Sequence, residues 1–190
     1  MIFKRLILYF IATFLVINIS AQMFEGGFIG GLSASQIDGD TQKDYKKPGF
    51  YAGVFVETDF TQVIGAKIEL YYIGKGAKKK IDDFEEFNTT LRYVDMPFLL
   101  TIKPFDRAEL DIGVALSYLI NSKYVTLGNT IPGGVDGMHH FDFGAMASAS
   151  YYFTDNLAFN VRVEYSMVPV KNYPNWFNNN LSFGLVYKIL

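Results

Sequence analysis

Cysteine is absent from this 190-residue chain, and charged side chains make up only 19% of it. Without cysteine there is no disulfide framework, no cysteine-based zinc site and no bacterial lipid anchor on cysteine. Lys and Arg number 17 against 19 Asp and Glu, so no basic excess exists to neutralise a phosphate backbone. We therefore expect no nucleic-acid partner.

Long apolar runs are also lacking. The first, Leu6 to Ile17, has twelve residues, short of the roughly 20 that a spanning helix needs. It follows Lys4 and Arg5 and leads to Ala21, the layout of a secretory signal. We predict a cleaved signal peptide at 1–21 and one exported domain at 22–190. Its net charge is −4, because the signal removes two of the 17 bases and none of the 19 acids.

Aromatic residues are abundant, with 13 Tyr and 18 Phe, and the apolar residues recur at every second position. From Leu157 onward, for example, one face is apolar while the other carries Arg162 and Glu164. A period of two indicates a β-strand with one apolar and one polar face. The pattern predicts eight strands, at 24–35, 50–57, 64–72, 90–103, 109–120, 140–153, 157–167 and 181–189.

The connections between these strands alternate strictly in length. Long ones span 36–47, 75–88, 124–138 and 168–178, and short ones span 59–62, 104–107 and 154–156. With an even strand count, this pattern is typical of a bacterial outer-membrane barrel with long loops outside and tight turns in the periplasm. Strands of about 10 residues match a tilted crossing of the bilayer. We predict an all-β, eight-stranded antiparallel up-and-down transmembrane β-barrel whose termini are both periplasmic.

A soluble barrel of the lipocalin kind has the same strand count but turns its apolar face inward. Charge placement favours the membrane barrel, because the apolar phase carries almost no charge except Arg92. A soluble barrel would scatter Lys and Glu over its outer face, whereas this face is apolar with aromatic residues near the strand ends. We therefore expect the apolar phase to contact the lipid of a bacterial outer membrane.

The opposite phase holds the charges, inside a barrel just wide enough for side chains to fill. Buried charges are tolerable if paired or hydrated, so we predict interior ion pairs rather than a conduction path. Pro97 would cost a ladder bond, which predicts a β-bulge there. The predicted ion-pair residues are Glu57, Lys67, Glu69, Asp95, Asp142, Arg162, Glu164 and Lys188, and Glu25, Lys103, Glu109 and Asp111 share their phase.

Three segments resemble the PorT-like outer-membrane β-barrel family of Bacteroidota. They are the glycine-spaced opening at 26–33, the aromatic-acidic-Pro segment Tyr93-Val94-Asp95-Met96-Pro97-Phe98-Leu99-Leu100, and the closing segment at 181–188. The likeness covers nearly all of the mature chain. It implies an outer-membrane barrel, and the name member of that family is associated with protein secretion across the membrane. Most relatives have no assigned activity, and the motifs are not catalytic.

Enzymatic signals are sparse. Eight-stranded barrels that deacylate lipid A use a His and a Ser at the outer rim on the lipid side, which makes His139 a candidate, but the phase of Ser166 points inward. Without base-to-nucleophile geometry this pair is a weak signal for catalysis, and we interpret His139 and His140 as polar rim residues. No His-Glu-x-x-His spacing occurs. We expect a non-enzymatic protein without a cofactor, the alternatives being a lipid A-modifying enzyme and a narrow solute pore.

Loops held by a rigid barrel are a usual place for specificity. Lys78, Lys79 and Lys80 precede an acidic run, and either pair with it or contact lipopolysaccharide phosphates. In the last loop, Trp176 and Phe177 are candidate anchors for a protein partner, although Trp176 equally suits the membrane interface. The partners we expect are outer-membrane lipid, lipopolysaccharide and a further protein of that membrane, in a structural, secretion or surface-assembly role.

Overall fold

The computed structural model describes residues 24–39, 45–81, 84–126, 129–131, 135–172 and 174–189, with the backbone alone at 80–81 and 84–86. The predicted signal peptide at 1–21 lies outside these ranges. In the described part, no helix is long and apolar enough to cross a membrane.

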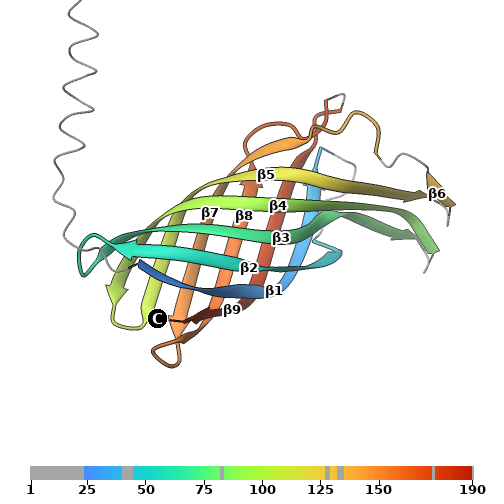
Figure 1. The fold of residues 1–190 in the computed structure, drawn as a ribbon. Coiled ribbons are helices and arrows are strands. Elements are labelled where there is room, and N and C mark those ends of the chain that lie inside the picture. Colours follow the sequence, from blue (N-terminus) through green and yellow to red (C-terminus); the bar gives the residue numbers. More distant parts are fainter. Residues whose placement is uncertain are drawn as a thin grey trace, which may run out of the picture.

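The described residues form nine strands, and eight of these close into a barrel (Figure 1). Neighbours in the wall pair antiparallel throughout, β5 pairs with β7, and β9 returns to β1 to close the wall. The short β6 pairs only with the end of β5. The predicted eight-stranded antiparallel up-and-down barrel is thus confirmed. The strands are β1 (Phe24–Asp38), β2 (Lys47–Asp59), β3 (Ile64–Ile81), β4 (Phe84–Phe105), β5 (Ala108–Thr126), β6 (Asn129–Ile131), β7 (Phe141–Tyr152), β8 (Leu157–Ser166) and β9 (Phe177–Lys188).

Alternation along each strand decides which side chains enter the barrel. In β8, Phe159, Val163 and Tyr165 are exposed while Arg162 and Glu164 are buried. The predicted phases therefore match the observed burial. The three tight turns, which join β2 to β3, β4 to β5 and β7 to β8, define the short-turn end of the barrel. The opposite end is called the long-loop end.

At the long-loop end, three strands run well past the wall, contrary to the loop predicted at 75–88. Pairing of β2 with β3 stops at Ile73 and pairing of β7 with β5 stops at Tyr118, yet β3, β4 and β5 remain paired to one another. The register sets Lys78 opposite Asn88 and Lys80 opposite Glu85. We call residues 74–81, 84–92, 119–126 and 129–131 the projecting sheet; it extends beyond the barrel in Figure 1.

The β-bulge predicted at Pro97 is not present. The β3–β4 register is the same on both sides of it, with Ile68 opposite Phe98 and Tyr71 opposite Asp95. Proline lacks an N–H, so one hydrogen bond of the ladder is missing at this position. The strands pass it without an inserted residue. A register shift with β5 lies instead between Arg92 and Tyr93, where one extra residue of β5 faces the same strand.

Candidate functional site

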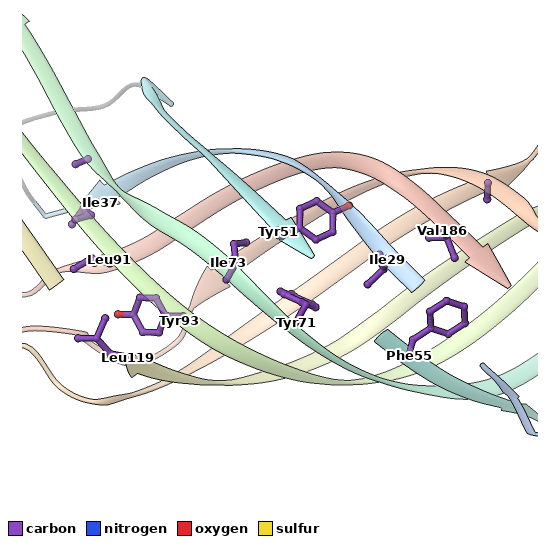
Figure 2. Packing of buried hydrophobic residues seen from close by; sticks show 12 residues of the cluster. Ile29, Ile37, Tyr51, Phe55, Tyr71, Ile73, Leu91, Tyr93, Leu119 and Val186 are labelled. Atoms are coloured by element: carbon purple, nitrogen blue, oxygen red, sulfur yellow. The ribbon is translucent and has the colours of Figure 1, made fainter. Parts of the chain in front are cut away.

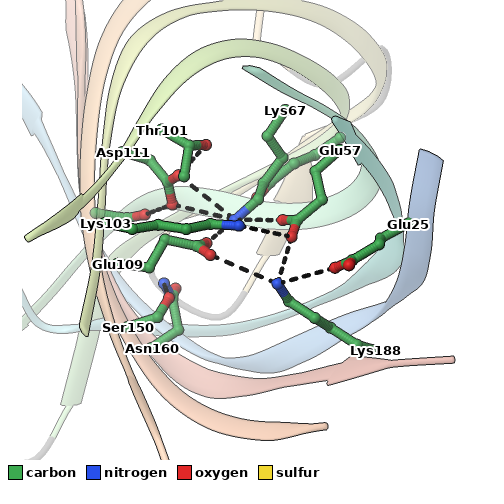
Figure 3. A network of polar contacts seen from close by, with 12 residues as sticks. Glu25, Glu57, Lys67, Thr101, Lys103, Glu109, Asp111, Ser150, Asn160 and Lys188 are labelled. Atoms are coloured by element: carbon green, nitrogen blue, oxygen red, sulfur yellow. Dashed lines mark hydrogen bonds and ion pairs between the residues drawn. The ribbon is translucent and has the colours of Figure 1, made fainter. Parts of the chain in front are cut away.

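The interior near the short-turn end holds a charge network centred on Lys67 (Figure 3). Its Nζ lies 3.2 Å from Glu57 and 3.4 Å from Asp111, and also contacts Glu109. Lys188 contacts Glu57 and lies 3.7 Å from Glu109. Each of these five residues is at most 9% exposed. Cations and carboxylates thus share partners, which offsets part of the cost of burying each charge.

Hydroxyl groups and a rim lysine complete this network. Thr101 and Ser148 each donate a hydrogen bond of 2.8 Å to Asp111. Lys103, closer to the mouth, lies 2.6 Å from Asp59 and 3.9 Å from Glu57. A cavity of about 480 Å³ opens beside it, lined among others by Lys103, Arg107 and Tyr152. Water therefore has a route to the outer edge of the network.

Arg162 occupies the middle of the barrel. Its guanidinium donates to both carboxylate oxygens of Glu69, at 2.7 and 3.4 Å, and its Nε donates to Asn160 at 2.9 Å. The rings of Tyr51 and Tyr71 lie on it, with centroids 5.0 and 5.4 Å from Cζ. Arg162 is thus a planar cation held by a bidentate carboxylate and two aromatic faces.

Toward the long-loop end, the buried cation is Lys75, which lies between two carboxylates. Its Nζ lies 2.6 Å from Glu164 and 2.8 Å from Asp95, and 5.1 Å from the centre of the Tyr93 ring. The sequence analysis missed Lys75 because it assigned the residue to a loop. The signal was available, since Lys75 continues the inward parity of Glu69, and β3 simply runs on through it.

Asp142 was predicted to form an ion pair, but its partners are neutral donors. Ser166 donates to it at 2.7 Å and Asn178 at 2.9 Å, and among the described residues no cation forms an ion pair with it. The Ser166 hydroxyl in turn accepts the backbone N–H of Asn178 at 3.0 Å. Neutral donors thus replace the expected cation. Ser166 is buried in this cluster, whereas His139 is exposed and contacts Asn172, so the structure does not bring the two together.

Beyond Lys75 the interior combines buried apolar side chains with the buried hydroxyls of Ser35 and Thr89. A cluster of buried hydrophobic residues runs along the barrel, from Leu91 and Leu119 to Phe55 (Figure 2). The last loop closes this end: Val170 is fully buried, and His139 donates its backbone N–H to the Val170 carbonyl at 2.8 Å. The long-loop end of the interior is therefore packed with side chains.

The two residues predicted to anchor a protein partner, Trp176 and Phe177, pack against other residues of this chain. Trp176 is half-buried and packs against the core cluster, and the Lys171 Nζ lies 4.5 Å from the centre of its ring. Phe177 stacks on Tyr165 with ring centroids 6.2 Å apart. Nearby, burial and then the charge of Asp38 raise the pKa of the Tyr45 phenol above its usual value.

The three lysines lie on the projecting sheet instead of a loop. Lys78 and Lys79 are half-buried in β3, where the register sets them opposite Asn88 and Phe87. For Lys80 the structure gives the backbone position alone, opposite Glu85.

The outer wall is an apolar band between two rings of aromatic residues. The ring toward the long-loop end, here the long-loop girdle, includes pairs of neighbouring rings, such as Phe50 with Tyr72 and Tyr118 with Phe141, both at 5.2 Å. Aromatic girdles of this kind lie at the two membrane interfaces. The long-loop girdle consists of Phe50, Tyr72, Tyr118, Phe141, Tyr165 and Phe177, and the short-turn girdle of Phe24, Phe60, Phe105, Tyr151, Phe153 and Tyr187.

A family model described as outer membrane protein beta-barrel domain matches residues 20–172. The chain belongs to this family. It is accordingly an outer-membrane β-barrel protein, and its exposed apolar band is the surface that meets lipid.

Solved structures share this fold at low identity. The attachment invasion locus protein Ail of Yersinia pestis is 13% identical with a TM-score of 0.55, over 87% of this chain and 98% of Ail. A second Ail structure, in complex with the heparin analogue sucrose octasulfate, gives 12% identity and a TM-score of 0.53, over 87% of this chain and 99% of that one. Neisserial surface protein A gives 14% and 0.53, over 87% and 97%. A search of curated proteins found no match.

Proposed function

We propose that this chain is a PorT-like, non-enzymatic outer-membrane barrel that acts as a structural or partner-binding component of a secretion or surface-assembly complex. The projecting sheet carries this proposal, because it is an ordered surface that the wall does not need for closure. In this proposal the long-loop end faces outside and both termini are periplasmic, with a cleaved signal peptide at 1–21.

The projecting sheet has the properties of a surface for another protein. Beyond Ile73 its β3 edge has no strand partner in the described chain. Ser33 and Ser35 of β1 already donate to the carbonyls of Gly74 and Gly76 at 3.1 Å, so the stretch without a ladder partner begins at Ala77. An incoming strand can add to such an edge. Lysines along it, such as Lys79, disfavour pairing between copies of the chain. The edge therefore favours a different partner.

A filled interior supports a structural role over a narrow pore. Tyr51, Tyr71 and Tyr93 are each at most 2% exposed; the first two rings lie on Arg162, and the third lies on Lys75. Likewise, the separation of the buried Ser166 from the exposed His139 argues against a lipid A-modifying enzyme. Steady single-channel conductance by the purified protein, or a change in lipid A mass that His139→Ala abolishes, would reverse these choices.

Partner capture tests the proposal directly. Tagged protein is crosslinked in intact cells, extracted in mild detergent, and compared with an unrelated barrel. We expect one stoichiometric protein partner, whose capture falls at least several-fold with Lys78→Glu/Lys79→Glu, because charge reversal alters the β3 edge. Lys46→Glu, exposed at the same end but outside the sheet, is the matched control. Equal capture by the double variant, or no partner beyond the control barrel, would contradict the proposal.

Orientation needs its own experiment. An epitope inserted at Asp136 and Gly137, an exposed turn of the long-loop end, should be labelled on intact cells. The same epitope in the tight turn at Thr61 and Gln62 should be labelled only after the outer membrane is opened. The reverse pattern would place the termini outside.

A further inference from the structure

Arg92 is a cation on the lipid-facing phase of β4. Its neighbours Leu91 and Tyr93 are fully buried, so the exposed Arg92 side chain points away from the barrel. Lipid-facing arginine is costly near the bilayer midplane and nearly free of cost at the interface. Its partner on β3 is Gly74, which has no side chain and so offers Arg92 no acceptor from a side chain.

A second exposed cation lies beside it. The register sets Arg92 opposite Asn121 on β5, and Lys123 follows two residues later on the same face. Such diagonal neighbours have Cα atoms roughly 7–8 Å apart, within reach of long side chains. In the described part of the chain, neither Arg92 nor Lys123 has a hydrogen-bond or ion-pair partner. Two cations without an acceptor thus lie side by side on the outer wall.

An apolar groove of about 380 Å³ begins directly below these cations, on the outward face of β4, β5 and β7. Val94 and Tyr118 form its upper edge, and Val94 is two residues from Arg92 on the same face. Strand geometry places that step at about 6.6 Å. The groove is lined by Leu70, Val94, Met96, Leu116, Ser117, Tyr118, Phe141, Asp142, Phe143 and Val168, of which all but Ser117 and Asp142 face outward.

The level of the site in the membrane follows from the girdle. Tyr118 and Phe141 belong to the long-loop girdle, and the His140 ring stacks on Tyr118 with centroids 5.9 Å apart. Arg92 and Lys123 lie on the long-loop side of the long-loop girdle. Side chains just beyond an aromatic girdle are at the height of lipid head groups, and those below it are at the height of acyl chains.

We propose that Arg92 and Lys123 bind a phosphate of lipid A, the phosphorylated anchor of lipopolysaccharide, while one of its acyl chains lies in the groove at Val94, Leu116 and Phe141. Two cations with no internal partner match the charge of a phosphate monoester, to which Arg can donate in bidentate fashion. The choice of lipid A over an inner-leaflet phospholipid rests on the proposed orientation, which turns the long-loop end to the outer leaflet.

Binding of lipid A to the full-length protein in detergent tests the cations. We compare Arg92→Gln/Lys123→Gln with Arg107→Gln, an exposed cation at the short-turn end, using diphosphorylated lipid A as the probe and phosphatidylglycerol as the competitor. Each lost charge-assisted bond should weaken binding about tenfold. Unchanged affinity in the double variant overturns the site, and equal affinity of the native protein for the two lipids overturns the assignment to lipid A.

The groove is tested on its own. Leu116→Trp should fill it and weaken lipid A binding severalfold, whereas Ile112→Trp, equally outward on β5 but outside the groove, should not. This pair also decides the question if the double cation variant does not fold, as judged by its heat-dependent gel mobility. Equal binding by both Trp variants overturns the proposal. Because binding in detergent does not depend on orientation or on a protein partner, failure of this site is distinguishable from failure of the proposed function.

Discussion

The two halves of the barrel interior bury charge in different ways. Near the short-turn end, one carboxylate, Glu57, contacts Lys67, Lys188 and, at 3.9 Å, Lys103. Near the long-loop end, Lys75 alone serves both Asp95 and Glu164 among the described residues. The half near the short-turn end has several cations that share carboxylates, next to a mouth that water can enter. In the half near the long-loop end, Lys75 is the cation between Asp95 and Glu164, beneath the packed side chains that close this end.

This difference predicts how strongly the loss of one cation destabilises each half of the interior. Where several cations share several carboxylates, the loss of one leaves the others partly neutralised. Where one cation serves two carboxylates in a sealed space, its loss leaves both without a counter-charge or water. The loss in the free energy of unfolding should therefore depend on how many cations still contact the remaining carboxylates. It should depend less on how many contacts the substitution removes.

Lys75→Met should have the largest effect. We expect it to lower the free energy of unfolding by about 3–5 kcal/mol, the usual cost of removing one partner of a buried pair. Lys67→Met should cost less, although Lys67 touches three carboxylates, because Lys188 still contacts Glu57 and Glu109. Urea unfolding of the protein in detergent, followed by the fluorescence of its single tryptophan, measures both.

A neutral triple variant is the control for this result. Lys75→Met combined with Asp95→Asn and Glu164→Gln removes the charges together and should recover most of the lost stability. A larger cost for Lys67→Met than for Lys75→Met would show that contacts matter more than redundancy.

The wall of the barrel was predictable because a period of two needs only local sequence. Arg162 and Glu164 face inward for the same reason that Phe159 and Val163 face outward. Lys75 obeys that rule as well, and it was missed because a lysine-rich stretch suggests a loop while pairing with β4 makes it a strand.

Other features depend on contacts between distant segments. Asp142 obtains Asn178 from another strand as a donor, and Val170 is buried by its position in the closing loop. Alternation gives the side of the wall for each residue but not its height along the barrel. The partner of an interior charge depends on that height, and so on strand register.

Arg162→Lys tests the boundary between the halves. Lysine keeps the charge but loses the planar face that Tyr51 and Tyr71 cover and one of the two bonds to Glu69. We expect a loss of about 1–2 kcal/mol, because stacking and bidentate geometry are lost while neutralisation is kept. Comparing this change in the native and Tyr51→Leu backgrounds isolates the share that stacking on Tyr51 contributes. An equal cost in both would assign the effect to Tyr71, Glu69 and Asn160 instead.

Lys103→Gln should have the smallest effect. Lys103 is 21% exposed and its closest partner, Asp59, is 43% exposed, so the pair lies at the watery mouth of the redundant half. Exposed pairs contribute about 0–1 kcal/mol, and salt screens them. The cost should therefore shrink further between about 0.1 M and 1 M salt, whereas the cost of Lys75→Met should stay constant. A salt-independent loss above about 2 kcal/mol would mean that Glu57 depends on Lys103 as strongly as Glu164 depends on Lys75, and the contrast between the two halves would disappear.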